Sequence, residues 1–186
     1  YAELRYVSPS GSDTGPGTEA RPWRTIRKAV EAARAGDTIY VRAGTYPERV
    51  VFRVSGAEGQ FITLTNQPGE EAIIEGRGIR LPADWGGLLD ISGQSHIRIS
   101  GLKIRNAGPH VNNPGILVDR SRRIIIENTH TYNTSSSGIG VWNSEYVVIA
   151  DNEVELACND GQQECITVAG TAHFEVRNNR VHHGGP

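Results

Sequence analysis

Residues 139–154 read IGVWNSEYVVIADNEV, and the pattern of apolar residues in this segment indicates the fold class. It holds two short segments, Ile139-Gly140-Val141 and Val147-Val148-Ile149, with apolar residues at their first and third positions. Such alternation is typical of strands with one buried face. The second segment begins eight residues after the first, and Val154 follows as a third apolar position. The stretch therefore predicts three short strands joined by bends.

The same arrangement occurs at three further places in the chain. From one second triplet to the next leading triplet the chain takes 19, 15 and 19 residues, so all variation in length falls at one corner. Repeats of 23 to 27 residues predict a solenoid, in which each coil buries its apolar side against the next. The leading triplets begin at Leu89, Ile116, Ile139 and Ile166, the second triplets at Ile97, Ile124, Val147 and Phe174, and the third inward positions are Ile104, Thr131, Val154 and Val181.

The residue types within the repeats indicate the kind of solenoid. The Leu-x-x-Leu-x-Leu pattern of leucine-rich repeats is absent, and Ile and Val dominate. These β-branched residues favour strands, and Gly and Asn favour the bends between them. We therefore predict an all-β fold, a parallel β-helix with three short strands per coil. The predicted bends lie at Gly101, Asn128, Asn152 and Asn178.

The first third of the chain does not repeat and reads as a cap followed by irregular coils. Residues 25–35 place Ile26, Ala29, Val30 and Ala33 at helical spacing, with Gly36 as the terminating residue. A helix there would shield the strand edges of the first coil. Opening strands are expected at 38–41, 50–52 and 61–64. The chain is thus predicted to be one domain, 1–186, with a cap region at 1–36 and coils at 37–186.

The C-terminal residues show no comparable protection. Residues 181–186 end roughly halfway through a coil, without a helix to cover the last backbone groups. We expect either that the natural protein is longer, or that something docks on this coil, including a second copy of the chain.

Composition and cysteine content narrow the partners and the compartment. Nineteen Lys and Arg against 21 Asp and Glu give a net charge of -2, so neither nucleic acid nor an acidic membrane surface is expected as a partner. The sequence has no run of 18 apolar residues to span a membrane, and it begins at Tyr1, which indicates a processed or trimmed chain. Cys158 and Cys165 enclose a turn-prone segment, so a disulfide and an extracellular location are expected.

The N-terminal residues, together with the coil pattern, resemble a known family. Residues 6–13 read YVSPSGSD, residues 15–18 GPGT, residues 22–26 PWRTI and residues 36–46 GDTIYVRAGTY. They resemble the caps of pectate-lyase-like right-handed parallel β-helix proteins, notably polysaccharide lyase family nine and chondroitinase B-like proteins. The resemblance implies a right-handed, single-stranded β-helix that is secreted and acts on polysaccharides. It also implies a basic residue as proton acceptor and calcium held by acidic residues.

The residues themselves supply this chemistry poorly. The sequence contains two lysines, Lys28 in the expected helix and Lys103 after a second strand, and it has no acidic run like the family's calcium site. An arginine is a demanding base because its pKa is high. We therefore assign no catalytic residue from the sequence, and calcium rests on the resemblance alone.

The outward positions of the leading strands offer a binding surface instead. One predicted exposed column holds Asp90, Leu117, Gly140 and Thr167, and the next holds Ser92, Asp119, Trp142 and Ala169, followed by Arg120, Asn143 and Gly170. In a groove along these columns, Trp142 would stack on a sugar ring while Asp119, Arg120 and Asn143 bind hydroxyl or carboxyl groups. The alternatives are that Trp142 packs against a loop or a partner, and that Asp119 and Arg120 form a solvated pair.

Five other residues have side chains of types that bind metal ions, but no metal site is expected from them. Asp160 and Glu164 supply too few carboxylates for calcium, and His110, His182 and His183 lack partners at metal spacing, so all five are expected on the surface.

Two functions follow. The first is a secreted β-helix that recognises a polysaccharide and is, or belongs to, a lyase-like enzyme. The second is a non-catalytic structural β-helix that associates end to end or laterally in an extracellular assembly.

Overall fold

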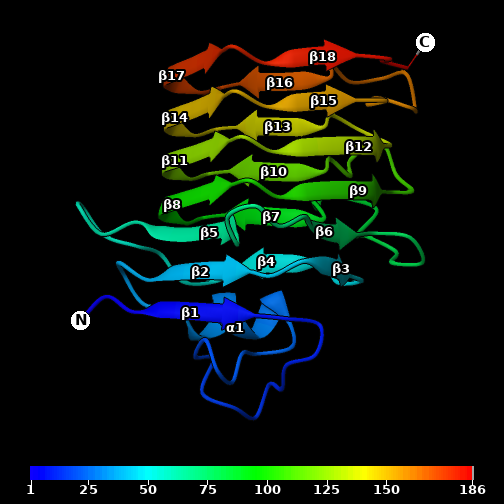
Figure 1. Cartoon of the computed structure of the whole chain (residues 1–186). Helices are drawn as coiled ribbons and strands as arrows, with labels where there is room; N and C mark the ends of the chain where they lie inside the picture. Colours follow the sequence, from blue (N-terminus) through cyan, green and yellow to red (C-terminus); the bar gives the residue numbers. More distant parts are fainter. Residues whose placement is uncertain (186) are drawn as a thin grey trace.

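A computed structural model describes residues 1–185 as a parallel β-solenoid with one helix at its N-terminal end (Figure 1). The strands form three parallel sheets of seven, six and five strands, which we call sheets A, B and C. This confirms the predicted all-β fold with a short capping helix. Sheet A holds β1 (Leu4–Val7), β2 (Thr38–Val41), β5 (Ile62–Asn66), β8 (Ser95–Ser100), β11 (Arg122–Glu127), β14 (Glu145–Ala150) and β17 (Ala172–Arg177). Sheet B holds β3 (Gly44–Tyr46), β6 (Ala72–Glu75), β9 (Lys103–Ala107), β12 (His130–Thr134), β15 (Glu153–Glu155) and β18 (Arg180–His182). Sheet C holds β4 (Val50–Phe52), β7 (Leu89–Ser92), β10 (Ile116–Asp119), β13 (Ile139–Trp142) and β16 (Ile166–Ala169).

The predicted register is confirmed in all three sheets. In sheet C, Ile116 pairs with Leu89 on one side and Ile139 on the other, and Ile139 pairs with Ile166. The second and third inward positions stack in the same way in sheets A and B. Ile116 and Ile139 are 0% exposed. The repeating apolar positions therefore form one continuous interior along the solenoid.

The bends repeat a left-handed backbone conformation, which the sequence located to within one residue. Gly101, Asn128 and Asn178 have φ values of 70°, 51° and 54°, as expected of residues that tolerate this region. The predicted bend at Asn152 is wrong by one position, because Asp151 takes the positive φ of 59°. Asn152 points inward instead and accepts hydrogen bonds at Oδ1 from the backbone N–H and the hydroxyl of Thr129.

The helix α1 (Ile26–Ala32) caps the first coil, with Ile26, Ala29 and Val30 buried beneath it. Thr25 caps the helix, since its hydroxyl oxygen accepts a hydrogen bond from the backbone N–H of Lys28 at 3.1 Å. The helix ends three residues before the predicted Ala35, and Gly36 has a φ of 90° in the turn that follows. Strand β1, which the sequence did not predict, pairs with β2 and extends sheet A into the cap region.

The last coil is much more exposed than the others. Phe174, Val176 and Val181 are 53%, 44% and 46% exposed, whereas their partners Val147, Ile149 and Val154 in the coil before are 0–1% exposed. Pro186, with which the predicted domain ends, lies outside the described residues. In a solenoid an inward position is buried only where a neighbouring coil or cap covers it.

The cysteines are neighbours but are not bonded. Cys158 is buried and Cys165 is half-buried, and both are free thiols. Burial raises the pKa of the Cys158 thiol to about 12, and the nearby Cys165 and Glu164 act in the same direction. Among residues 1–185, no helix has the length and apolar character needed to cross a membrane.

Candidate functional site

The outer face of sheet C is covered, and this corrects the predicted exposed column. Asp90, Leu117 and Thr167 are 4%, 0% and 8% exposed, and Gly140 is buried as well. The segment 79–88 lies over this face: a side-chain carbon placed at Gly87 would stand 2.7 Å from Cβ of Leu117. The Asn113 side-chain amide holds the segment in place by donating to the carbonyl oxygens of Pro82 and Gly86 at 2.8 and 3.0 Å. A side chain that points outward from sheet C is therefore not necessarily exposed to solvent.

Asp90 has a structural role beneath this segment. Its Oδ2 accepts hydrogen bonds from Arg49 Nη2 at 2.9 Å and from the backbone N–H of Gly87 at 3.0 Å. Its Oδ1 accepts one from the Ser92 hydroxyl at 2.7 Å. Both oxygens are thus engaged within the protein.

Trp142 also packs against the covering segment. Its ring lies 4.6 Å from that of Trp85, measured between centroids, with the planes at 72° in an edge-to-face arrangement. The ring covers Gly140, where a side chain would collide with it. The structure thus shows the packing that the first alternative describes, and the stacking of a sugar on the remaining half-exposed indole stays a prediction.

The other three predicted binding residues come together at the end of sheet C. Asp119 is 6% exposed, and its carboxylate accepts hydrogen bonds from Arg120 Nε at 3.0 Å and Asn143 Nδ2 at 3.4 Å. The Arg120 side chain is 70% exposed. Arg120 and Asn143 stand at equivalent left-handed positions of successive coils, with φ values of 46° and 50°. The Asp119–Arg120 pair is therefore a buried carboxylate that orients an exposed guanidinium.

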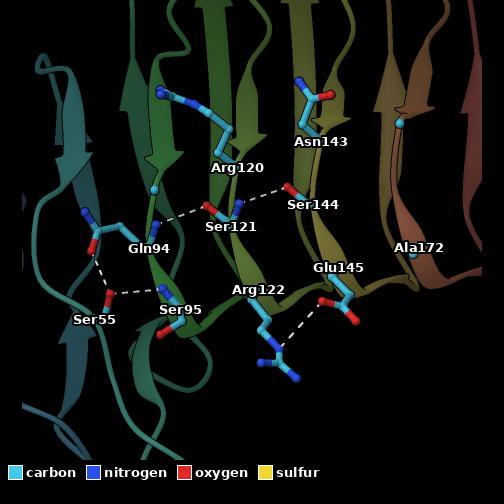
Figure 2. A pocket seen from close by; sticks show the side chains of 12 residues that line it. Ser55, Gln94, Ser95, Arg120, Ser121, Arg122, Asn143, Ser144, Glu145 and Ala172 are labelled. Carbon is cyan, nitrogen blue, oxygen red and sulfur yellow. Dashed lines mark hydrogen bonds and ion pairs between the residues drawn. The ribbon is translucent and has the colours of Figure 1, made fainter.

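An open groove runs along the bend between sheets C and A, across successive coils (Figure 2). Its volume is about 580 Å³. Figure 2 shows Arg120 and Asn143 on one side of this groove and Arg122 and Glu145 on the other. Its lining consists of Ser55, Gly93, Gln94, Ser95, Arg120, Ser121, Arg122, Asn143, Ser144, Glu145, Gly170 and Ala172. We call it the bend groove.

Hydroxyl groups fix the floor of the bend groove. Ser121 Oγ accepts from the backbone N–H of Gln94 at 3.2 Å, and Ser144 Oγ accepts from that of Ser121 at 3.1 Å. Thr171 Oγ1 continues the series by accepting from the backbone N–H of Ser144 at 3.3 Å. Each coil therefore satisfies a backbone donor of the coil before, which keeps the bends in register.

The exposed charges of the groove are mainly basic. Arg122 has a 57% exposed side chain, with Nε 3.9 Å from a carboxylate oxygen of Glu145. Arg122, two residues after Arg120, was not predicted as a binding residue, because the predicted columns of outward residues ended at the bend. Two guanidinium groups beside amide and hydroxyl groups suit a ligand that carries carboxylates and hydroxyls.

Neither lysine faces this groove. Lys28 lies in α1, and Lys103 Nζ donates to a carboxylate oxygen of Glu71 at 3.0 Å on sheet B. Among the residues described, the groups able to hold a metal ion all contain histidine. Asp90 and Asp119 are engaged by arginines. These residues do not fit the acidic calcium cluster that the resemblance implies. We therefore assign no calcium ligands in this chain.

Comparison with curated proteins finds two partial matches. It is 40% identical over 101 residues to the uncharacterized protein YwoF of Bacillus subtilis, which is 54% of this chain and 22% of that protein. It is 41% identical over 88 residues to pectate lyase PEL9 of Emericella nidulans, which is 46% of this chain and 22% of that protein. Each match therefore spans about a fifth of the relative's length, 22% in both cases.

Solved structures share the fold at low sequence identity. A rhamnogalacturonan lyase aligns with a TM-score of 0.76 and 18% identity, covering 96% of this chain and 51% of that one. A lacto-N-biosidase from Eubacterium ramulus aligns with a TM-score of 0.72 and 14% identity, covering 96% and 41%. Residues 5–163 match the family model described as the Pel9A-like, right-handed beta helix region. The chain therefore belongs to the Pel9A-like right-handed β-helix family.

Proposed function

We propose that this chain is a secreted β-helix that recognises an acidic polysaccharide in the bend groove, as part of a lyase-like protein. The observation that carries the proposal is the basic groove itself, which crosses successive coils and exposes the guanidinium groups of Arg120 and Arg122. A relative named as a pectate lyase and a structural neighbour named as a rhamnogalacturonan lyase support the substrate class.

The groove suits a linear polymer because its contacts repeat along the solenoid. Neighbouring coils are about 4.8 Å apart, so an extended chain lying along the axis meets equivalent backbone positions, with different side chains, at regular steps. Arg120 and Asn143 occupy such equivalent positions, and so do Arg122 and Glu145. Carboxylates on the sugar would pair with the arginines, while Asn143 and Gln94 bind hydroxyl groups.

We propose cleavage by β-elimination only for the whole lyase-like protein, and not for this chain alone. In that reaction a base removes the proton beside the uronate carboxyl, the bond from the sugar to the leaving oxygen breaks, and a carbon–carbon double bond forms. The planar guanidinium groups of the two arginines match the geometry of a carboxylate, so we assign them as partners of the sugar carboxylates. We therefore assign this chain a binding role and name no catalytic residue.

The test uses oligogalacturonates and the complete 186-residue chain. We expect saturable binding by calorimetry, and a loss of at least about tenfold in affinity for the Arg120→Ala/Arg122→Ala double variant. Arg24→Ala, an exposed arginine in the cap, is the matched control and should bind normally. Binding that the double variant retains in full would remove the proposal. Absorbance of the unsaturated product, followed with calcium and with a chelator, tests elimination in the same samples.

We also propose that the protein is secreted and that Cys158 and Cys165 then form a disulfide. The two thiols are neighbours, which favours pairing in an oxidising compartment. Protein exported to a bacterial periplasm and then unfolded in denaturant, which makes the buried Cys158 accessible, should resist thiol alkylation until it is reduced. Full alkylation without reductant would contradict this part alone.

The alternative function is a structural role by self-association, in which a second copy of the chain would cover the apolar side chains of the last coil, Phe174, Val176 and Val181. It predicts concentration-dependent growth in sedimentation experiments, which Val176→Lys should abolish. A monomer at high concentration would dismiss it.

A further inference from the structure

A cluster of histidine and glutamate side chains lies on the outer face of sheet B, away from the bend groove. His130 on β12 pairs in register with Glu153 on β15, and Glu155 on β15 pairs with His182 on β18. His130 Nε2 lies 2.9 Å from Glu155 Oε2 and 4.0 Å from Glu153 Oε2. His182 Nε2 lies 2.7 Å from Glu153 Oε1. The four side chains therefore face one another diagonally across three successive coils.

These four side chains are partly shielded from water. Their exposed fractions are 23% for His130, 36% for Glu153, 26% for Glu155 and 22% for His182. The ligand atoms of His130, Glu153 and Glu155 all lie within 4.8 Å of one another, and so do those of Glu155, His182 and His183. Glu155 thus belongs to both groups, and His182 is joined to the first by its contact with Glu153.

The donor set points to one chemical class of ion. Two imidazole nitrogens with two carboxylates suit zinc and similar divalent transition metals, which prefer four ligands at about 2.0 to 2.2 Å. Calcium prefers six to eight oxygen ligands, about twice the number of groups present here. The ligand atoms fall within 4.8 Å of one another in two groups of three, so a single ion held by all four side chains requires side-chain movements that bring these groups together.

The outer partners of the cluster also fit a metal. A histidine that binds a metal through Nε2 carries its proton on Nδ1 and usually donates it to a neighbouring group. His182 Nδ1 lies 2.7 Å from His183 Nδ1, which can accept a hydrogen bond from it. Of the nearby cations, Lys103 and Arg105 are both turned to Glu71, at 3.0 and 3.8 Å. The carboxylates of Glu153 and Glu155 can therefore offset the charge of an ion. Arg180, which pairs in register with Glu153, is a further cation near the cluster.

We propose that His130, Glu153, Glu155 and His182 form a binding site for one divalent transition-metal ion of the zinc class. The ion would link β12, β15 and β18 and so tie the exposed last coil to the two coils before it. The site is separate from the bend groove, so it stands or falls independently of the proposed polysaccharide binding.

The test is a titration of the complete chain, without a histidine tag and after treatment with a chelator, with zinc. We expect one ion per chain by calorimetry, and a rise in the melting midpoint. His130→Gln and Glu155→Gln should each weaken zinc binding by at least tenfold, whereas His173→Gln, an exposed histidine on β17, should not. Cobalt provides a second readout: the wild type should show the strong visible bands of four-coordinate cobalt, and Glu155→Gln should lose them.

Because these side chains lie on the outer face, the variants are expected to keep the wild-type circular dichroism and their affinity for oligogalacturonate. No stoichiometric binding of zinc by the wild type would overturn the proposal. So would zinc binding and cobalt bands that persist in both His130→Gln and Glu155→Gln.

Discussion

The outer face of sheet C and the bend beside it differ sharply in exposure, although they are neighbours in sequence. Leu117 points outward on β10 and is 0% exposed, whereas the side chain of Arg120, three residues later, is 70% exposed. The difference comes from the segment 79–88, which covers the strand face and leaves the bend open. In a solenoid, the coils thus define which residues point outward, and the irregular corner segments decide which of those reach solvent.

The largest expected effect is on the covered face. Leu117→Ala should lower the free energy of unfolding by about 2 to 5 kcal/mol, because it leaves a cavity under the covering segment. Ile125→Ala is the matched control, since Ile125 also points outward but is half-buried on sheet A, and it should cost about 1 kcal/mol or less. Denaturant unfolding measures both. Equal costs would mean that the segment does not cover Leu117 in solution.

The next effect concerns the two tryptophans that join the covering segment to the sheet. Trp142→Ala should cost about 2 kcal/mol of stability, and a double-mutant cycle with Trp85→Ala should show a coupling of about 0.5 to 1.5 kcal/mol. If instead Trp142→Ala leaves stability unchanged and weakens the binding of oligogalacturonate, the indole stacks on sugar rather than on Trp85.

In the open bend, unlike on the covered face, substitution of Arg120 or Arg122 should weaken binding and leave stability unchanged. Arg120→Ala and Arg122→Ala should each weaken oligogalacturonate binding by about tenfold, or 1.4 kcal/mol. Their free energies of unfolding should stay within about 0.5 kcal/mol of the wild type, as for other surface changes. Isothermal titration and denaturant unfolding on the same samples separate the two. A stability loss as large as that of Leu117→Ala would show that the groove is not an open surface.

The smallest effect tests the groove floor. Ser121→Ala removes the hydroxyl that accepts from the backbone of Gln94, and it should cost about 1 kcal/mol. Ser121→Thr should cost less, because Thr171 already fills the equivalent position in a later coil. Thermal melts of the two variants compare them. An equal loss in both would argue that the hydroxyl ladder does not hold the bends.

The coils were predictable from the sequence because the solenoid imposes a fixed spacing. Inward positions such as Ile116 and Ile139 must recur at each coil, and the constant offset of eight residues locates both strands of sheets C and A. The bends were found to within a residue, since Asn152 and Asp151 both belong to residue types that favour turns.

The covering segment could not be predicted in the same way. Residues 79–88 follow no repeat, and Trp85 meets Trp142 only after the chain has passed through further coils. Strand β1 was missed for a similar reason, because its pairing with β2 depends on the path of the cap.

The proposed metal site has a signal in the sequence. His130 and Glu153 are 23 residues apart and Glu155 and His182 are 27 apart, which are the spacings of the coils themselves. Ligands in a solenoid are therefore to be sought one coil apart rather than at the short spacings of a single loop.

A crystal structure of the chain with an oligogalacturonate bound would show directly whether the bend groove holds the sugar. We expect the sugar to lie along the bend between sheets C and A, with its carboxylates hydrogen-bonded to Arg120 and Arg122, and residues 79–88 still to cover Leu117. A sugar bound on sheet A or B, or on the face of sheet C after displacement of that segment, would contradict this expectation.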